Sequence, residues 1–293
     1  MDGVLVIDKP VGMTSHDVVQ RVRRWAGQRR VGHLGTLDPL ATGVLPLALG
    51  EATKLSRLLT HGRKTYRGKI RLGIETDTYD REGRVMSEHT GLWPEREKLE
   101  SALGAFRGAI QQVPPPYSAV KTGGEAAYRL ARKGIPVELE PRTVSIYELE
   151  LLDYSPPFLE LVVECSAGTY LRSIAHDLGA LLGIGAHLWE LCRTRSGPFE
   201  IDRATRLEDL QEPGEQLLIP MPEATGLPTC AVEIGVARRV AHGVQLSRRD
   251  VPGAPRDGLF QLVRDGAMVA LVEATGGLPL FRTVRVFLEG TRT

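Results

Sequence analysis

The sequence predicts an α+β fold with two domains, and three observations support this prediction. Segments with strand-like alternation and segments with helical spacing both occur, but not in the strict strand-helix-strand order of a parallel α/β protein. Val144 to Tyr154 and Phe158 to Ala167 are predicted to pair in a central sheet around Ser155-Pro156-Pro157. The length of 293 residues exceeds the size at which one core usually stops growing. We therefore expect a large domain over residues 1–225 and a small β-rich domain over residues 228–293.

The remaining elements follow from hydrophobic spacing and from the positions of Gly and Pro. Residues 3–8 predict a strand, and Ser15 is the expected N-cap of the helix that follows. Residues 32–50 are rich in glycine and proline and are expected to form a loop. Further elements are expected at Thr65 to Gly73, Leu99 to Phe106, Ile110 to Val113, Glu125 to Lys133, Thr169 to Gly183, 258–264, 267–274 and 280–287.

Composition excludes several classes of protein. No apolar run is long enough to span a bilayer, and the N-terminus carries an acid, Asp2, where a secretory signal carries positive charge. Cys165, Cys192 and Cys230 lie far apart without Cys-x-x-Cys spacing, which argues against a disulfide framework and against a zinc site. We therefore expect a cytoplasmic protein with no membrane span and no metal.

The distribution of charge is more informative than its sum. A net charge of +1 does not by itself suggest nucleic acid. Arginines nevertheless gather near both ends of the chain: Arg21, Arg23, Arg24, Arg29, Arg30, Arg238, Arg239, Arg248 and Arg249. A guanidinium is well shaped for bidentate phosphate contacts, but a solvated helix face gives the same pattern. Both interpretations stay open.

Asp38 is the one acid in an apolar, glycine-punctuated segment that runs from Gly32 to Pro46. An ionised carboxylate is costly to bury without a partner, so Asp38 is expected to face solvent, to cap a helix or to lie beside a cation in a site. The Asp-Pro dipeptide also favours a turn. From these residues alone, a turn and an active site remain alternatives.

The same segment carries a longer pattern, Gly32-His33-x-Gly35-x-Leu37-Asp38-Pro39-x-Ala41-x-Gly43-x-Leu45-Pro46. It resembles the signature of the TruB family of tRNA pseudouridine synthases, which isomerise uridine 55 in the T loop of tRNA. The resemblance implies that activity and a pseudouridine synthase domain with a central mixed, mainly antiparallel sheet flanked by helices. It also implies that Asp38 is the catalytic nucleophile and that His33 helps to engage the T loop.

Four further segments resemble the same family: Asp8-Lys9-Pro10-x-Gly12-x-Thr14-Ser15, Lys64-x-Tyr66 with Thr76-Asp77-Thr78-x-Asp80, Pro115-Pro116-Tyr117-Ser118-Ala119-x-Lys121, and Cys165-Ser166-x-Gly168-Thr169-Tyr170-x-Arg172-Ser173. The resemblance implies that Tyr66 stacks on the target base and that Arg172 pairs with the catalytic aspartate. It further implies a set of residues that bind the base or the RNA: His33, Tyr170, Leu191, Lys9 and Lys64.

Two parts of the resemblance are less complete. Cys192 stands where the family usually has an arginine, which puts a phosphate contact at that position in question. The C-terminal resemblance is to a PUA RNA-binding domain, and it rests on short motifs at Gly243, Gly258-Leu259-Phe260 and Val284-Arg285-Val286-Phe287.

The residue types suit the implied reaction. Pseudouridine formation breaks the N-glycosidic bond, turns the uracil over and rejoins it through carbon without redox change or hydrolysis, so we expect no cofactor. A carboxylate such as Asp38 can act as a nucleophile or abstract a proton, and a guanidinium such as Arg172 can pair with it. An aromatic side chain such as Tyr66 can hold an extruded base. We expect a monomer that binds the T stem-loop of tRNA and needs no nucleotide cofactor.

Two other classes of function stay open. A non-catalytic tRNA-binding or RNA-folding protein can share the scaffold, although it would not need Asp38, Tyr66 and Arg172 together. A base-releasing glycosylase or a zinc deaminase is the other class, but the His-x-Glu and Pro-Cys-x-x-Cys elements of a deaminase are absent. The cluster of His176, Asp177 and His187 fits no standard ligand spacing and is expected to be structural.

Overall fold

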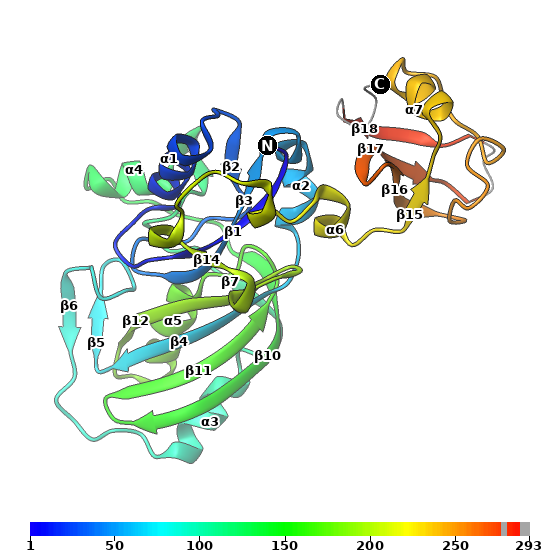
Figure 1. The fold of residues 1–293 in the computed structure, drawn as a ribbon. Coiled ribbons are helices and arrows are strands. Elements are labelled where there is room, and N and C mark those ends of the chain that lie inside the picture. The colour runs from blue at the N-terminus through cyan, green and yellow to red at the C-terminus, as the bar shows by residue number, and fades with distance from the viewer. Residues whose placement is uncertain (277–279, 288–293) are drawn as a thin grey trace.

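The computed structural model describes residues 1–276 and 280–287, and its main feature is one large sheet (Figure 1). The strands follow the order β14-β1-β3-β12-β4-β11-β10-β7, with β13 paired to β12 and β2 paired to β3. The β1–β14 and β12–β3 pairs are parallel, and the other pairs of this sheet are antiparallel. The expected mixed, mainly antiparallel sheet of an α+β protein is confirmed.

The strands of the large sheet are β1 Gly3–Lys9, β2 Val31–His33, β3 Thr42–Leu49, β4 Lys64–Leu72, β7 Gly108–Gln112, β10 Arg142–Ser155, β11 Phe158–Cys165, β12 Ala186–Ser196, β13 Phe199–Glu200 and β14 Thr205–Arg206. Two small hairpins are β5 Ile74–Thr76 with β6 Val85–Glu88, and β8 Lys121–Thr122 with β9 Glu125–Ala126. The helices are α1 Ser15–Ala26, α2 Ser56–Thr60, α3 Arg96–Gly104, α4 Ala127–Arg132, α5 Leu171–Leu182, α6 Met221–Thr225 and α7 Ile234–Ala241. Short 3₁₀ turns are η1 Gly50–Leu55, η2 Ile201–Arg203, η3 Leu207–Asp209 and η4 Glu215–Leu217.

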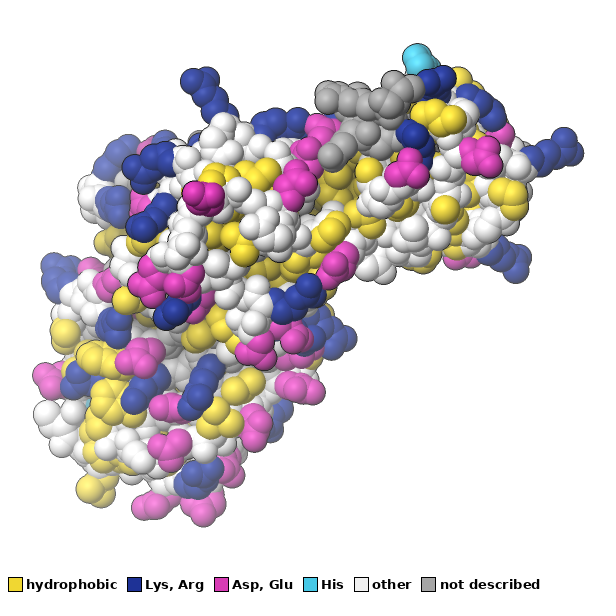
Figure 2. All heavy atoms as spheres, viewed as in Figure 1, with side chains coloured by type: hydrophobic (Ala, Val, Ile, Leu, Met, Phe, Trp, Pro, Cys, Tyr) yellow, Lys and Arg dark blue, Asp and Glu magenta, His cyan; other side chains and the backbone are white. Residues whose placement is uncertain are grey.

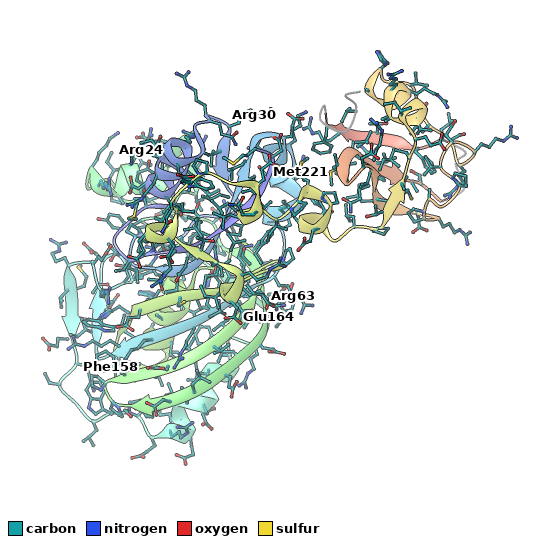
Figure 3. All side chains as sticks on the ribbon, in the orientation of Figure 1. Arg24, Arg30, Arg63, Phe158, Glu164 and Met221 are labelled. Atoms are coloured by element: carbon teal, nitrogen blue, oxygen red, sulfur yellow. The ribbon has the colours of Figure 1, made fainter. Side chains whose placement is uncertain are left out.

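One face of the β12–β4–β11–β10 part of the sheet is covered and the other is open. In Figure 1, α5 and α3 lie behind these strands. Strand β4 alternates accordingly, because Tyr66 and Ile70 are buried while Arg67 is exposed. On the open face, Arg63 of the loop before β4 pairs with Glu164 of β11 at 2.8 Å (Figure 3). Tyr66, one of the catalytic candidates, therefore lies on the covered face.

The N-cap of helix α1 lies one residue earlier than predicted. The N-cap is Thr14, whose Oγ1 accepts a hydrogen bond from Asp17 N at 3.1 Å, while Asp17 Oδ2 accepts one from Thr14 N at 2.9 Å. The prediction that Ser15 is the N-cap is wrong, because Thr14 forms this capping box with Asp17. The Ser15 side chain is buried and makes a different contact, which is described below.

The prediction of a loop over residues 32–50 is wrong for most of that segment. Strand β3 pairs with β1 from Gly43 to Leu49, and its side chains are buried. Long-range pairing overrides the local signals of glycine and proline here. Gly43 has φ +94°, and a Cβ there would lie 2.3 Å from Arg193 O of β12, so only glycine fits. The true loop is short and runs from Leu34 to Ala41, with Asp38 in it.

A second sheet of four strands follows α6: β15 Thr229–Ala231, β16 Gly258–Arg264, β17 Ala267–Ala274 and β18 Arg282–Val286. Met268 and Leu271 of β17, and Phe287 directly after β18, pack in one cluster with Met221 of α6 and Val6 of β1. Figure 3 labels Met221 at this junction, and Figure 1 shows the small sheet beyond α6. Residues 277–279 and 288–293 of the expected 228–293 domain lie outside the described residues.

Candidate functional site

Asp38 and Arg172 meet although 134 positions separate them in the chain. Arg172 Nη2 donates a hydrogen bond to Asp38 Oδ1 at 3.1 Å, and Arg172 Nε lies 2.9 Å from Asp38 Oδ2. The side chain of Arg172 is 4% exposed and that of Asp38 is 33% exposed. A carboxylate that a substrate can reach is thus backed by a buried guanidinium, which balances its charge and fixes its orientation.

Arg172 is itself held from three other directions. Its Nη1 donates to Thr78 O at 3.1 Å and lies 3.5 Å from Asp80 Oδ2, and its Nη2 also donates to Tyr117 O at 3.1 Å. A buried cation needs such partners, because it is costly to remove from water. These contacts fix the plane of the Arg172 guanidinium and therefore the direction from which Arg172 contacts Asp38.

Asp80 belongs to this network, although no role was predicted for it from the sequence. Its Oδ1 accepts hydrogen bonds from Thr78 Oγ1 at 2.7 Å and from Glu82 N at 3.0 Å. Burial raises the pKa of the Asp80 carboxyl, while these bonds and Arg172 lower it. Its place in the Thr76-Asp77-Thr78-x-Asp80 motif was the only available signal, since the contact to Arg172 spans most of the domain.

The loop that carries Asp38 is tied down on both sides of that residue. Ser15 Oγ accepts a hydrogen bond from Leu37 N at 2.8 Å and lies 3.1 Å from Leu37 O, to which it can donate. On the other side, Pro39 O accepts from Gly12 N at 2.8 Å and from Lys9 Nζ at 3.3 Å. The start of the chain therefore positions the residues directly before and after Asp38.

Arg193 of β12 holds the backbone on both sides of Asp38, in the loop before it and in β3 after it. It is 1% exposed, and it donates to three carbonyl oxygens: Val44 O at 2.8 Å, Thr36 O at 3.3 Å and Gly35 O at 3.2 Å. A buried arginine saturated by backbone carbonyls acts as a structural clamp. No role was predicted for Arg193 from the sequence. Its neighbour Cys192 is the position that departs from the family pattern.

Tyr66 and Leu191 lie on neighbouring strands of the covered face. Tyr66 of β4 is opposite Arg193 in the register, and Leu191 of β12 is opposite Gly68. Both side chains are almost buried, at 7% and 8% exposed, and burial raises the pKa of the Tyr66 hydroxyl. A Cβ at Gly68 would make only ordinary van der Waals contacts, one of them with Leu191 Cδ1 at 3.7 Å.

Tyr170 is the N-cap residue of α5, two residues before Arg172. Its backbone is clamped by one side chain, since Tyr170 N donates to Gln112 Oε1 at 2.8 Å and Gln112 Nε2 donates to Tyr170 O at 3.0 Å. Burial raises the pKa of the Tyr170 hydroxyl, and the negative charge of Asp38 raises it further. Tyr170 is thus within the electrostatic reach of Asp38.

Lys9 and Lys64 are placed differently from the other candidates. Lys9 is 0% exposed and donates to Pro10 O, Met13 O and Pro39 O, while Lys64 is 5% exposed and donates to Thr60 O and Gly62 O. Burial lowers the pKa of each ammonium group from 10.5 to about 8. Neither group reaches the surface, and both hold loop carbonyls, which favours a structural role over contact with RNA.

His33 lies at the end of β2, five residues before Asp38. Its side chain is half-buried, and its Nδ1 is buried without a hydrogen-bond partner in the described part of the chain. Burial lowers the pKa of His33, and Arg193 lowers it further, so the ring is held neutral at neutral pH. Because Nδ1 is buried, an incoming ligand can reach this nitrogen only if the ring moves.

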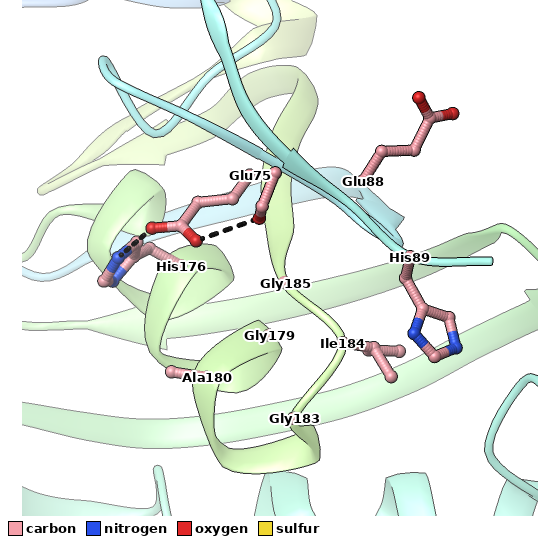
Figure 4. Close-up of a pocket in the computed structure, with 10 residues that line it drawn as sticks. Glu75, Glu88, His89, His176, Gly179, Ala180, Gly183, Ile184 and Gly185 are labelled. Atoms are coloured by element: carbon pink, nitrogen blue, oxygen red, sulfur yellow. Dashed lines mark hydrogen bonds and ion pairs between the residues drawn. The ribbon is translucent and has the colours of Figure 1, made fainter. Parts of the chain in front are cut away.

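Two hollows of the described residues are not lined by Asp38. One of about 340 Å³ is lined by Glu75, Ser87, Glu88, His89, His176, Gly179, Ala180, Gly183, Ile184 and Gly185 (Figure 4). Another, lined by Gln20, Arg23, Arg24, Gly27, Gln28 and Arg29, lies at the end of α1. Lys and Arg side chains gather over this part of the face in Figure 2. Residues 1–276 and 280–287 contain no group of three or more His, Cys, Asp or Glu that could hold a metal ion.

Comparison with known proteins shows the family of this chain. Residues 23–171 match the N-terminal domain of the TruB family pseudouridylate synthases, and residues 172–218 match the tRNA pseudouridylate synthase B C-terminal domain. The chain belongs to the TruB family. The boundary between the two matches falls between Leu171 and Arg172, so Asp38 and its partner come from different family segments.

Relatives and solved structures extend this match along the chain. The TruB-family protein is 48% identical to tRNA pseudouridine synthase B of Solibacter usitatus, over 95% of this chain and 94% of the relative. It is 43% identical to the protein of the same name from Geobacter sulfurreducens, over 95% of each. A solved Cbf5-Nop10-Gar1 complex contains a chain that superposes with a TM-score of 0.73 at 30% identity, covering 97% of this chain and 84% of that one.

Membrane-spanning helices are not found in this TruB-family protein: within the described ranges, no helix combines the length and the apolar character that a bilayer requires. Cys192 is a free, half-buried thiol on β12, opposite Thr42 of β3 and Arg67 of β4. The strand is held at Cys192 by backbone pairing with β3 and β4.

Proposed function

We propose that this TruB-family protein is a tRNA pseudouridine synthase that isomerises uridine 55 in the T loop, with Asp38 as the nucleophile. The observation that carries the proposal is the pairing of a partly exposed Asp38 with a buried Arg172. The curated relatives are named tRNA pseudouridine synthase B, which supports tRNA as the substrate.

The reaction requires a carboxylate that is charged, oriented and accessible. Arg172 supplies charge balance and orientation, and the 33% exposure of the Asp38 side chain supplies access. Ser15 and Lys9 fix the backbone on either side, so the carboxylate does not have to be ordered when the substrate arrives. A preorganised nucleophile of this kind lowers the barrier of both cleavage and rejoining of the glycosidic bond.

The target base must leave its stack to reach Asp38. Tyr66 is proposed to stack on the extruded uracil, and Leu191 and Tyr170 are proposed to line the pocket around it. Tyr66 and Leu191 project from adjacent strands on the covered face, and Tyr170 precedes Arg172 on α5. Because these side chains are nearly buried without substrate, we expect small side-chain movements when the base enters.

His33 and the C-terminal domain are proposed to contact the rest of the tRNA. His33 lies five residues before Asp38 in the chain and is proposed to engage the T loop. Residues 228–293 are proposed to form a PUA-like RNA-binding domain next to the 1–225 catalytic domain. We further propose that the protein acts as a monomer in the cytoplasm, without a metal or nucleotide cofactor.

The test is to incubate the purified protein, without added metal or nucleotide, with an unmodified tRNA transcript and to map pseudouridine by carbodiimide treatment and primer extension. The proposal predicts one new stop, at the T-loop uridine. Tight tRNA binding without any modification would instead indicate an RNA-folding protein, and release of free uracil would indicate a glycosylase.

A further inference from the structure

His176 lies one helical turn after Arg172 on α5, and both of its ring nitrogens face carboxylates. Its Nδ1 is 3.0 Å from Asp177 Oδ1, and its Nε2 is 3.2 Å from Glu75 Oε1 of β5 (Figure 4). A neutral imidazole can donate from only one nitrogen, which would leave a lone pair against a carboxylate on the other side. The geometry therefore fits the doubly protonated, positively charged ring.

The same ring stacks on Tyr79, with ring centroids 3.8 Å apart and an interplanar angle of 23°. Tyr79 has φ +65°, a left-handed conformation that is unusual for a residue other than glycine. Such a conformation persists only where the surroundings hold it in place. His176 provides a flat, charged surface that holds the Tyr79 ring and hence its backbone.

The residues on either side of Tyr79 are the ones that hold Arg172. Thr78 O accepts a hydrogen bond from Arg172 Nη1, and the Asp80 carboxylate lies 3.5 Å from the same nitrogen. A change in the conformation of Tyr79 would move both groups. The contacts thus form a continuous path from His176 through Tyr79 to Arg172 and on to Asp38.

We propose that protonated His176 is a positioning residue, which fixes the Thr78–Asp80 turn and through it the guanidinium that orients Asp38. This inference rests on the proposed function, because it concerns the geometry in which Asp38 reacts. His176 does not reach the substrate in this role. Its cluster was expected from the sequence to be purely structural.

The charged groups around His176 favour its protonated form. Asp177 is the next residue on α5, and Glu75 faces the ring from β5. Glu88, the last residue of β6, and His89 after it line the hollow that His176 also lines. The hydrogen bond to Asp177 and the charge of Glu75 raise the pKa of His176 above 6.5, against the opposing effect of burial. The ring is charged below this raised pKa and loses the charge as the pH increases through it.

The test measures the single-turnover rate of pseudouridine formation at saturating protein, between pH 6 and pH 9, for the wild type and three variants. His176→Phe keeps an aromatic ring against Tyr79 but removes the charge. Glu75→Gln keeps an acceptor for His176 but removes the negative charge that stabilises the imidazolium. His89→Ala is the matched control, because His89 lines the same hollow and its ring nitrogen faces Leu92 O rather than the Tyr79 turn.

The proposal predicts that the wild-type rate falls as the pH rises through a midpoint above 6.5, and that Glu75→Gln moves this midpoint to lower pH. His176→Phe is expected to lose this transition and to react roughly tenfold more slowly at neutral pH, because a small displacement of a catalytic group is sufficient for such a loss. Its tRNA affinity should be unchanged, and His89→Ala should match the wild type.

Either of two results would overturn the proposal: a wild-type rate and pH transition in His176→Phe, or an unmoved midpoint in Glu75→Gln. The midpoint of Glu75→Gln tests the proposal even if His176→Phe does not fold. Failure of the proposed function is distinguishable, because the wild type would then form no pseudouridine at any pH.

Discussion

Arg172 contacts Asp38 from a position that solvent does not reach, while Asp38 itself stays one-third exposed. Asp38 is thus accessible to a substrate, while Arg172 fixes the orientation of the Asp38 carboxylate. Arg172 also donates to Thr78 O and Tyr117 O, so the pair is anchored to two further backbone segments.

Arg172→Lys should reduce the single-turnover rate about 100-fold or more. A lysine keeps the charge but cannot reach Asp38, Thr78 O and Tyr117 O at once, and such loss of preorganised contacts weakens catalysis by factors of this size. Arg67→Lys is the matched control, because Arg67 pairs with Glu160 on the open face of the sheet. An equal loss of rate in both variants would contradict the assigned role of Arg172.

Ser15→Ala should lower both stability and rate. The Ser15 hydroxyl satisfies the buried Leu37 N–H, which would be left unpaired next to Asp38, at a cost of about 1–3 kcal/mol. Thr14→Ala removes the helix cap instead and should cost about 1 kcal/mol of unfolding free energy with little change in rate. Chemical denaturation and single-turnover assays of both variants check this. The account of the loop fails if Thr14→Ala slows the reaction as much as Ser15→Ala.

Gly43→Ala should be far more destabilising than Gly27→Ala. Both glycines have positive φ, so each substitution introduces backbone strain of about 1 kcal/mol or more. Only Gly43 is crowded, since its Cβ would lie 2.3 Å from Arg193 O, whereas nothing lies within 4 Å at Gly27. Melting temperatures of the two variants test the difference. Equal melting temperatures would show that β3 and β12 can separate without cost.

Lys64 should make stability depend on pH in a specific direction. Its folded-state pKa of about 8 is below its ordinary value of 10.5, so between these values the unfolded chain binds more protons than the folded one. The unfolding free energy of the wild type should therefore increase relative to Lys64→Met as the pH rises from 8 toward 10, by on the order of 1–2 kcal/mol. Lys98→Met, at an exposed position of α3, should show no such change. Denaturant titrations at pH 7.5 and pH 9.5 measure it, and a relative decrease would contradict the burial of this charge.

The sequence was most informative where local pattern and long motif agreed. The β10–β11 pair and α5 were predicted from alternation and helical spacing, and the structure places them close to the expected bounds. The TruB resemblance also predicted that Arg172 pairs with Asp38, and the structure shows this pair. Composition and spacing alone left Asp38 as either a turn residue or a catalytic one.

Contacts between distant segments could not be predicted from the sequence where the resemblance assigned the residues no role. Arg193 donates to Gly35 O and Thr36 O across more than 150 positions, and no periodic pattern encodes such a contact. The same holds for Asp80 beside Arg172, and for the burial of Lys9 and Lys64, whose long polar side chains are expected at the surface by default. Strand β3 was missed because its pairing with β1 outweighs its glycine and proline.

The most direct test of the account is the single-turnover release of tritium from tRNA labelled at uridine C5, with the wild type and Asp38→Asn at equal tRNA occupancy. Rejoining the base through C5 displaces that hydrogen, so release reports the isomerisation itself. We predict release of one equivalent from the T-loop uridine by the wild type and none above background by Asp38→Asn, with tRNA affinity unchanged. Release by Asp38→Asn at a rate near that of the wild type would contradict the central claim that Asp38 performs the chemistry.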